Sequence, residues 1–176
     1  MADWILDTDR LRLSPVTVDD TELMLAVWND PAFIRNVADR GIRTVEQARE
    51  AIEDGVQKLF ENHGFGPCSM SLKSDGTQLG ICGLFKRENL DAPDIGFSVL
   101  PAHCGKGFAG EAAAAVVSYA QSELGISALT AIVSPTNVPS IGLIEKLGLK
   151  FERMITMPGD DDATSLYRMT LPALSQ

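Results

Sequence analysis

Apolar and polar positions along the chain repeat with the periods of strands and helices. Residues 10–14 alternate between the two, which predicts a half-buried strand. A helix should follow, with an apolar face made by Leu23, Met24, Val27 and Trp28. Residues 44–60 carry an apolar residue every three or four positions, and Thr44 with Gln47 matches a capping box, so they predict an amphipathic helix.

The second half of the chain first predicts strands and then alternates between helices and strands. Three strands joined by short turns read as an antiparallel meander, at residues 67–73, 78–87 and 93–100. A long helix from Phe108, a buried strand, a helix capped by Asn137 and two last strands at 150–157 and 164–170 complete the chain. No repeat or linker interrupts this order, so we expect residues 1–176 to form a single α/β domain.

Composition excludes several classes of function. The chain has 176 residues, of which 45% are hydrophobic and 22% charged, an ordinary globular balance. Its net charge of −9 argues against nucleic-acid binding, and no apolar run approaches the roughly 20 residues that span a bilayer. Three cysteines without metal-binding spacing and only two histidines predict reduced thiols and no metal site. We therefore expect a cytoplasmic protein without membrane or nucleic-acid partners.

The stretch LPAHCGKGFAGE at residues 100–111 links an apolar strand to a helix and is rich in glycine. Glycine lets backbone N–H groups turn toward one point, and a helix start adds unpaired N–H groups and the positive end of its dipole. Such a loop is suited to phosphate, with Lys106 as an added positive charge. A structural corner without a ligand is an equally good interpretation of this loop alone.

The order of elements and three motifs resemble the GNAT acetyltransferases, in particular their RimJ/RimL-type branch, which acetylates ribosomal proteins. The motifs are RLRL at 10–13, DIGFSVLP at 94–101 with GKGFAGE at 105–111, and SPTNVPSIGLIEKLGLKFE at 134–152. The resemblance implies an α/β (α+β) fold with a mixed, mostly antiparallel central sheet of about seven strands and about four flanking helices. It also implies that two parallel strands, here residues 95–100 and 128–133, splay apart.

The resemblance implies acetyl-CoA as the cosubstrate, without a metal. In the family, backbone amides of the glycine loop bind the CoA diphosphate; here they would belong to Cys104, Gly105, Lys106, Gly107, Phe108, Ala109 and Gly110. Main-chain groups of Phe97, Ser98 and Val99 would pair with the pantetheine arm. Asn137 matches an asparagine that contacts this arm, and a helix N-cap is an equally good interpretation of it.

Two positions depart from the family pattern. The first loop position is often Gln or Arg and here is Cys104, whose backbone amide can still bind phosphate. A Cys104 nucleophile is the less favoured alternative, because only the adjacent His103 is spaced to activate it. Ile144 stands where many members carry a tyrosine general acid, and it cannot donate a proton. The Ser140 hydroxyl or water would have to replace it.

Attack of an amine on a thioester requires a proton acceptor and donors for the developing oxyanion. Asp94 occupies a position where relatives often have glutamate, so we predict that it acts as the base through water. The alternative is that Asp94 is merely an exposed residue at a strand start. The Val99 N–H is the predicted oxyanion donor, and Glu88 with Asp91 would give an acidic entrance.

The sequence therefore predicts an N-acetyltransferase that moves acetyl from acetyl-CoA to a primary amine within a ternary complex. The acceptor is a protein N-terminus, such as that of a ribosomal protein, or a small-molecule amine. The missing tyrosine keeps a second function open, a CoA-binding sensor or interaction module without turnover. The oligomeric state, monomer or homodimer, is left open as well.

Overall fold

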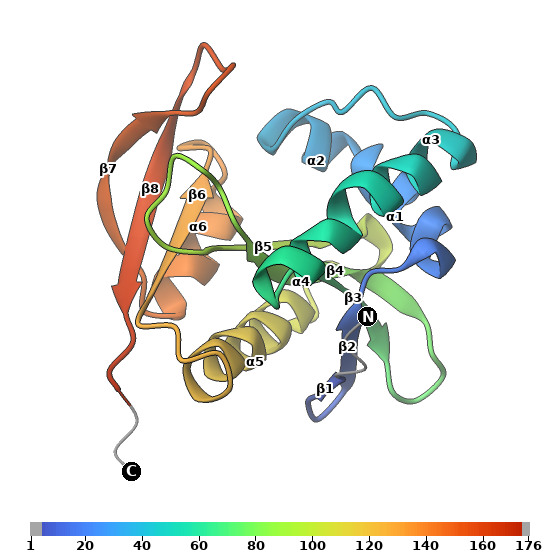
Figure 1. Ribbon diagram of the computed structural model, residues 1–176, viewed down its shortest axis with the longest axis horizontal. Coiled ribbons are helices and arrows are strands. Elements are labelled where there is room, and N and C mark those ends of the chain that lie inside the picture. The colour runs from blue at the N-terminus through green and yellow to red at the C-terminus, as the bar shows by residue number, and fades with distance from the viewer. Residues whose placement is uncertain (1–4, 174–176) are drawn as a thin grey trace.

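The computed structural model describes residues 5–173, and its strands form one sheet in the order β1-β2-β3-β4-β5-β6-β8-β7 (Figure 1). Neighbouring strands are antiparallel except β5 and β6, which are parallel. The strands are β1 (Leu6–Asp7), β2 (Leu11–Pro15), β3 (Pro67–Leu72), β4 (Gln78–Phe85), β5 (Asp94–Val99), β6 (Ala128–Val133), β7 (Lys150–Thr156) and β8 (Ala163–Thr170). The predicted sheet is confirmed, with the two-residue β1 as the strand that the sequence pattern did not predict.

The helices before β3 include the predicted one that starts after Thr44, which continues to His63 and so passes its predicted end at residue 60. They are α1 (Thr21–Trp28), α2 (Pro31–Asn36), α3 (Val45–Ala51) and α4 (Gln57–His63). Thr44 and Gln47 form the predicted capping box, and Gly64 follows α4 in the left-handed conformation, with φ 73°. The predicted helix over 44–60 is interrupted by a π-helical turn at Ile52–Val56. Val45 also lies outside the buried stripe, because 42% of it is exposed.

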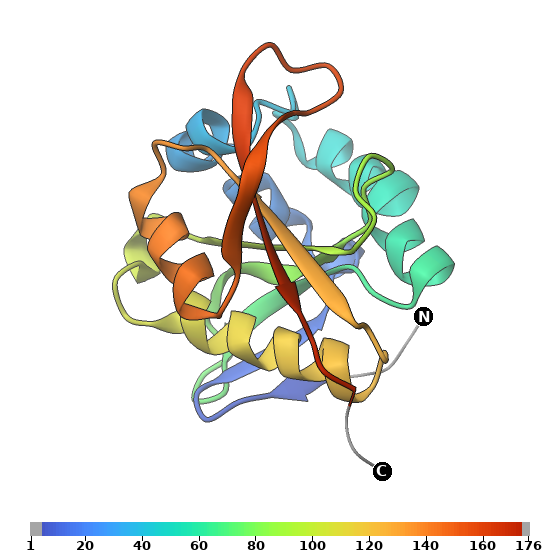
Figure 2. The same cartoon turned by 90° about the vertical axis from the view of Figure 1, so that its left-hand side faces the viewer.

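Two hydrophobic clusters hold the layers together. One joins the sheet to α5 (Phe108–Ser122) and α6 (Val138–Lys146), with Phe108, Ala112 and Val116 on the buried face of α5. The other joins α1 and α3 to the sheet through Val16 and Ile81. Figure 2 shows β6, β8 and β7 in front, with α5 beneath them and the N-terminal helices behind. The loop before α5 therefore stands on a helix that is packed firmly against the sheet.

Gly83→Ala should destabilise the fold, because β3 passes too close to β4 for a side chain at this position. A Cβ on Gly83 would lie 2.3 Å from the Gly66 carbonyl oxygen and 2.7 Å from the Pro67 Cα, both of which are backbone atoms. We expect the free energy of unfolding to fall by about 2–3 kcal/mol in urea titrations. Gly142→Ala is the control, since a Cβ there meets nothing within 4 Å and should be neutral or stabilising. Equal stability of both variants would contradict the close approach.

Candidate active site

The parallel strands β5 and β6 share a single pair of residues, Asp94 opposite Thr130. The Thr130 N–H donates to the Pro93 carbonyl at 2.8 Å, as in an ordinary parallel ladder. Two residues further along β6, the ladder would join the Ile132 N–H to the main-chain carbonyl of Ile95. Instead, the Ile132 N–H donates to Oδ1 of Asp94 at 3.1 Å. The carboxylate thus takes the place of a main-chain acceptor, and the two strands separate beyond this point.

Asp94 is held between two donors and shielded from water. Its Oδ2 accepts a hydrogen bond from Nε of Arg87 at 2.7 Å, while only 2% of the Asp94 side chain is exposed. Burial raises the pKa of Asp94 to about 6, against the lowering effects of Arg87 and the Ile132 N–H. The alternative interpretation of Asp94 as an exposed residue at a strand start is therefore wrong. A carboxyl group with a pKa near neutrality has the property that a general base needs.

The register of β4 and β5 decides which main-chain groups border the gap. The Leu100 N–H donates to the Leu79 carbonyl at 2.8 Å, and Ser98 lies opposite Ile81. Hydrogen-bonded pairs alternate along antiparallel strands, so the main-chain groups of Ser98 face β4. Those of Phe97 and Val99 face the other way, toward β6. The gap is thus bordered by Phe97 and Val99, and the prediction for Ser98 is not supported by its position.

The glycine loop between β5 and α5 is exposed from Cys104 to Gly107. Gly105 and Gly107 adopt positive φ values of 75° and 79°, a backbone conformation that residues other than glycine rarely adopt. Phe108 is buried and begins α5, which brings the helix N-terminus to the loop. The loop therefore presents backbone amides at a helix start, which is the geometry expected of an anion site.

The start of α6 lies at the same open end of the gap as the glycine loop. Because β5 and β6 are parallel, the loops that follow them leave the sheet on the same side. A Cβ on Gly110 would lie 3.2 Å from Cδ1 of Leu143, so α5 and α6 approach closely. Asn137 caps α6 by accepting the Ser140 N–H at 3.4 Å, as its N-cap interpretation predicts. Ser140 is half-buried in the first turn of α6, whereas Ile144 is buried in the core.

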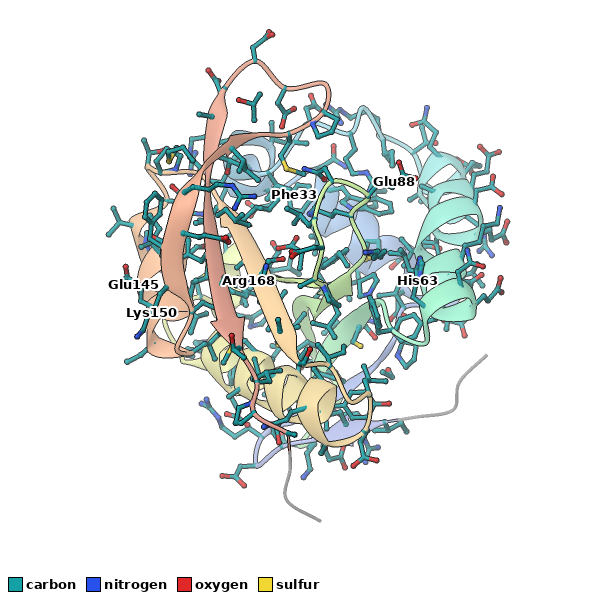
Figure 3. The ribbon with its side chains drawn as sticks, turned by 60° about the vertical axis from the view of Figure 1, so that its left-hand side comes forward. Phe33, His63, Glu88, Glu145, Lys150 and Arg168 are labelled. Atoms are coloured by element: carbon teal, nitrogen blue, oxygen red, sulfur yellow. The ribbon has the colours of Figure 1, made fainter. Side chains whose placement is uncertain are left out.

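The connection between β4 and β5 covers the face of the sheet that is opposite α5, near the gap. Its Asp91 forms an ion pair of 2.7 Å with Arg168 of β8. Figure 3 labels Glu88 on this connection and Arg168 on β8. The carboxylates predicted to shape an acidic entrance thus sit on one loop, but Asp91 is already paired with a cation.

Cys68, Cys82 and Cys104 are all free thiols, as the sequence predicts. Cys68 and Cys82 are buried, and burial raises the pKa of Cys82 to about 12. Cys104 is exposed, and its Sγ donates to the Val99 carbonyl at 3.4 Å. Residues 5–173 contain no helix that is long and apolar enough to cross a bilayer. The same residues include no group of three or more His, Cys, Asp or Glu side chains placed to hold a metal ion.

Comparison with known proteins agrees with this geometry. Residues 10–150 match the acetyltransferase (GNAT) domain family. The chain is a GNAT acetyltransferase. Among its relatives are the uncharacterized N-acetyltransferase p20 of Bacillus licheniformis, 30% identical over 85% of this chain and 84% of that protein, and YoaA of Bacillus subtilis, 30% identical over 96% and 97%. This GNAT enzyme is therefore related to N-acetyltransferases over nearly its whole length.

Solved structures share the fold of this GNAT chain at low sequence identity. An acetyltransferase from Agrobacterium tumefaciens superposes with a TM-score of 0.80 at 22% identity, covering 96% of this chain and 95% of that one. RimL, a ribosomal L7/L12 alpha-N-protein acetyltransferase in complex with coenzyme A, superposes with a TM-score of 0.81 at 14% identity, covering 96% and 98%. The chain therefore shares its fold with these acetyltransferases.

Several residues of this GNAT site were not predicted. Arg87 and the Ile132 N–H, which hold Asp94, carry no sequence signal because they depend on pairing across the sheet. Arg10 is predicted only as part of a half-buried strand and of the RLRL motif, yet its Nη1 donates to the Lys106 carbonyl at 3.0 Å. Glu111, noted only as the end of the loop motif, forms an ion pair of 2.7 Å with Arg10. The joint presence of RLRL and GKGFAGE was the signal that these segments belong together.

Proposed function

We propose that this chain transfers the acetyl group of acetyl-CoA to a primary amine bound in the same complex. The observation that carries the proposal is the gap that opens where the Asp94 carboxylate replaces a main-chain acceptor for the Ile132 N–H. Main-chain groups of Phe97 and Val99 border this gap, and the glycine loop stands at its open end. The arrangement fits an extended arm that ends in a diphosphate, with amides from Gly105 to Gly110 around the diphosphate. The Cys104 N–H, which was predicted to join them, already donates to the Pro101 carbonyl at 3.3 Å.

Acetyl-CoA, when bound, supplies a thioester that an amine can attack. Phe97 lies two residues nearer to Asp94 than Val99 does, so its N–H is the deeper donor in the gap. We therefore assign the contact with the thioester oxygen to Phe97, in place of Val99, and leave Val99 to the pantetheine arm. A well-placed donor at this oxygen contributes about 3–4 kcal/mol as negative charge develops.

Asp94 is the proposed acceptor of the ammonium proton, through water. Each of its oxygens accepts one hydrogen bond in the structure, which leaves a lone pair on each. The Arg87 side chain is 34% exposed and connects the buried carboxylate to the surface. A water chain along Arg87 would let the proton leave, so that Asp94 is ready for the next amine.

Ser140 is the proposed donor of a proton to the leaving thiolate, with water as the alternative. It is half-buried, and its backbone is fixed by the Asn137 cap. Ile144, at the position of the family's tyrosine, has 2% of its surface exposed and packs in the core. The isoleucine at this position favours the second candidate function, a protein that binds CoA without turnover, because it offers the site no proton donor.

The acceptor is proposed to be a cationic amine. Glu88 on the β4–β5 connection and residues 160–162 on the β7–β8 connection are exposed carboxylates, and the net charge of −9 adds attraction for a cation. RimL is named for acetylating the α-amino group of a ribosomal protein. A protein N-terminus and a small amine are the two forms of acceptor that an assay has to distinguish.

Thiol release from acetyl-CoA should depend on the amine that is offered. We expect release above the amine-free rate with at least one class in a panel of N-terminal peptides, polyamines and amino acids, since a neutralised amine can enter beside Asp94. The measurement is release of free thiol, with calorimetry of acetyl-CoA binding on the same protein. Tight binding without release for every amine would favour the sensor, whereas no binding would reject both functions.

A further inference from the structure

The turn between β1 and β2 is fastened to the first turn of α5. The Glu111 carboxylate accepts hydrogen bonds from the Thr8 hydroxyl at 2.5 Å, from the Arg10 N–H at 2.9 Å and from the Arg10 Nε at 2.7 Å. The Thr8 hydroxyl also accepts the Leu11 N–H at 2.9 Å, so the donor itself is held in place. Only 20% of the Glu111 side chain is exposed. Three donors thus converge on one carboxylate immediately behind the glycine loop.

Arg10 reaches past Glu111 to the loop itself. Its Nη1 donates to the Lys106 carbonyl at 3.0 Å, and its guanidinium lies over the Phe108 ring, 4.6 Å from the ring centroid. In a trans peptide the C=O and the next N–H point in opposite directions. The bond to the Lys106 carbonyl therefore directs the Gly107 N–H away from Arg10. One side chain in this way sets the direction of an amide at the centre of the loop.

The same contact balances charge beside the proposed phosphate site. Hydrogen bonds from Thr8 and Arg10 hold the pKa of Glu111 below its ordinary value, although partial burial acts against them, so the carboxylate is ionised at neutral pH. A carboxylate in the first turn of α5 would repel a diphosphate bound at that turn. The Arg10 guanidinium, 2.7 Å away, offsets this charge.

We infer that Arg10, anchored by Glu111 and Thr8, is a positioning residue that presets the glycine loop for the diphosphate of CoA. The inference rests on the proposed function, because it assumes that this loop receives CoA. Lysine at this position keeps the positive charge but cannot reproduce both directed hydrogen bonds and the contact of the guanidinium with the Phe108 ring. Arg10→Lys therefore separates positioning from charge.

Arg10→Lys should weaken acetyl-CoA binding about tenfold in calorimetry, the size expected when one charge-assisted hydrogen bond is lost. With an active amine, KM for acetyl-CoA should rise by a similar factor while kcat at saturating acetyl-CoA stays within about twofold. Arg12→Lys is the matched control. Arg12 lies on the same hairpin and makes two hydrogen bonds of 2.9 Å, but to Asp7 and not to the loop. We expect it to bind acetyl-CoA as the wild type does.

The thermal unfolding temperature of each variant shows whether weaker binding comes from the loop or from loss of the fold. Thr8→Val is a second, milder test of the same contact. Thr8→Val removes one of the three donors to Glu111 and should weaken binding in the same direction by a smaller factor. If the wild type binds acetyl-CoA and both variants, still folded, bind it equally well, the inference is overturned and the proposed function stands. If the wild type itself does not bind acetyl-CoA, the proposed function fails.

Discussion

Asp94→Asn is expected to lower kcat/KM for amine acetylation about a hundredfold at neutral pH, within the range that a general base contributes. The amide cannot accept the ammonium proton, whereas its oxygen can still accept the Ile132 N–H that keeps β5 and β6 apart. In the wild type, kcat/KM should rise as pH increases through about 6, where Asp94 ionises. Initial rates of thiol release between pH 5 and 9 measure both effects.

The stability of the variant tests whether Asp94 acts by chemistry or by structure. The folded protein holds the proton of Asp94 up to about pH 6, above the ordinary aspartate value of 3.8, because the buried carboxylate is poorly solvated. Stability gained from this proton is therefore fully present below about pH 4 and is lost as pH rises to 6. Asparagine imitates the neutral form, so this part of the pH dependence should disappear in urea titrations of Asp94→Asn.

A loss of rate that is the same at every pH would contradict the role of Asp94 as the base. It would leave Asp94 only the task of separating the strands. Asp91→Asn is the matched control, because Asp91 lies on the connection that leads into β5 and also pairs with an arginine, but 76% of its side chain is exposed. We expect this control to keep the wild-type pH profile, since its carboxylate lies outside the gap.

Most of the fold follows from local sequence patterns. The capping box of Thr44 and Gln47 marks the start of α3, and Gly64 marks the end of α4, because both act within a few residues. The π-helical turn at Ile52–Val56 could not be predicted, since the apolar residues on either side keep a helical spacing. A two-residue strand such as β1 is too short to show any alternation.

The residues themselves predict the glycine loop, whereas Asp94, Phe97, Val99 and Asn137 are predicted from the family resemblance. Gly105 and Gly107 identified the loop, because positive φ values are encoded locally. The burial of Asp94 is a property of the folded sheet, in which its Oδ1 accepts the N–H of Ile132, 38 residues away, and the alternative interpretation as an exposed residue was therefore wrong. The bond from Arg10 to Glu111 spans 101 residues, and the joint presence of the RLRL and GKGFAGE motifs is the one sequence feature that connects the two segments. Register, which decides that Ser98 faces β4, is likewise a property of the folded sheet.

Gly107→Val should weaken acetyl-CoA binding about a hundredfold, roughly the effect of losing two hydrogen bonds to a charged group. Gly107 has a φ of 79°, which a β-branched residue adopts only under strain, so the valine would rotate the peptides on either side. Its Cβ would also stand 3.4 Å from the Arg10 Nη2, against the group that fixes the Lys106 carbonyl. The amides would then no longer converge on a diphosphate. Calorimetry with acetyl-CoA measures the effect.

Gly76→Val separates this effect from strain alone. Gly76 has a nearly equal φ of 76°, in the turn between β3 and β4, and a Cβ there would meet nothing within 4 Å. Both valines should therefore lower the unfolding free energy by a similar amount, about 1–3 kcal/mol. Only Gly107→Val should lose affinity, because only its peptides carry the amides proposed to bind phosphate. If Gly107→Val binds acetyl-CoA as tightly as Gly76→Val, the diphosphate does not rest on this loop, and the strand gap would have to bind the cosubstrate without it.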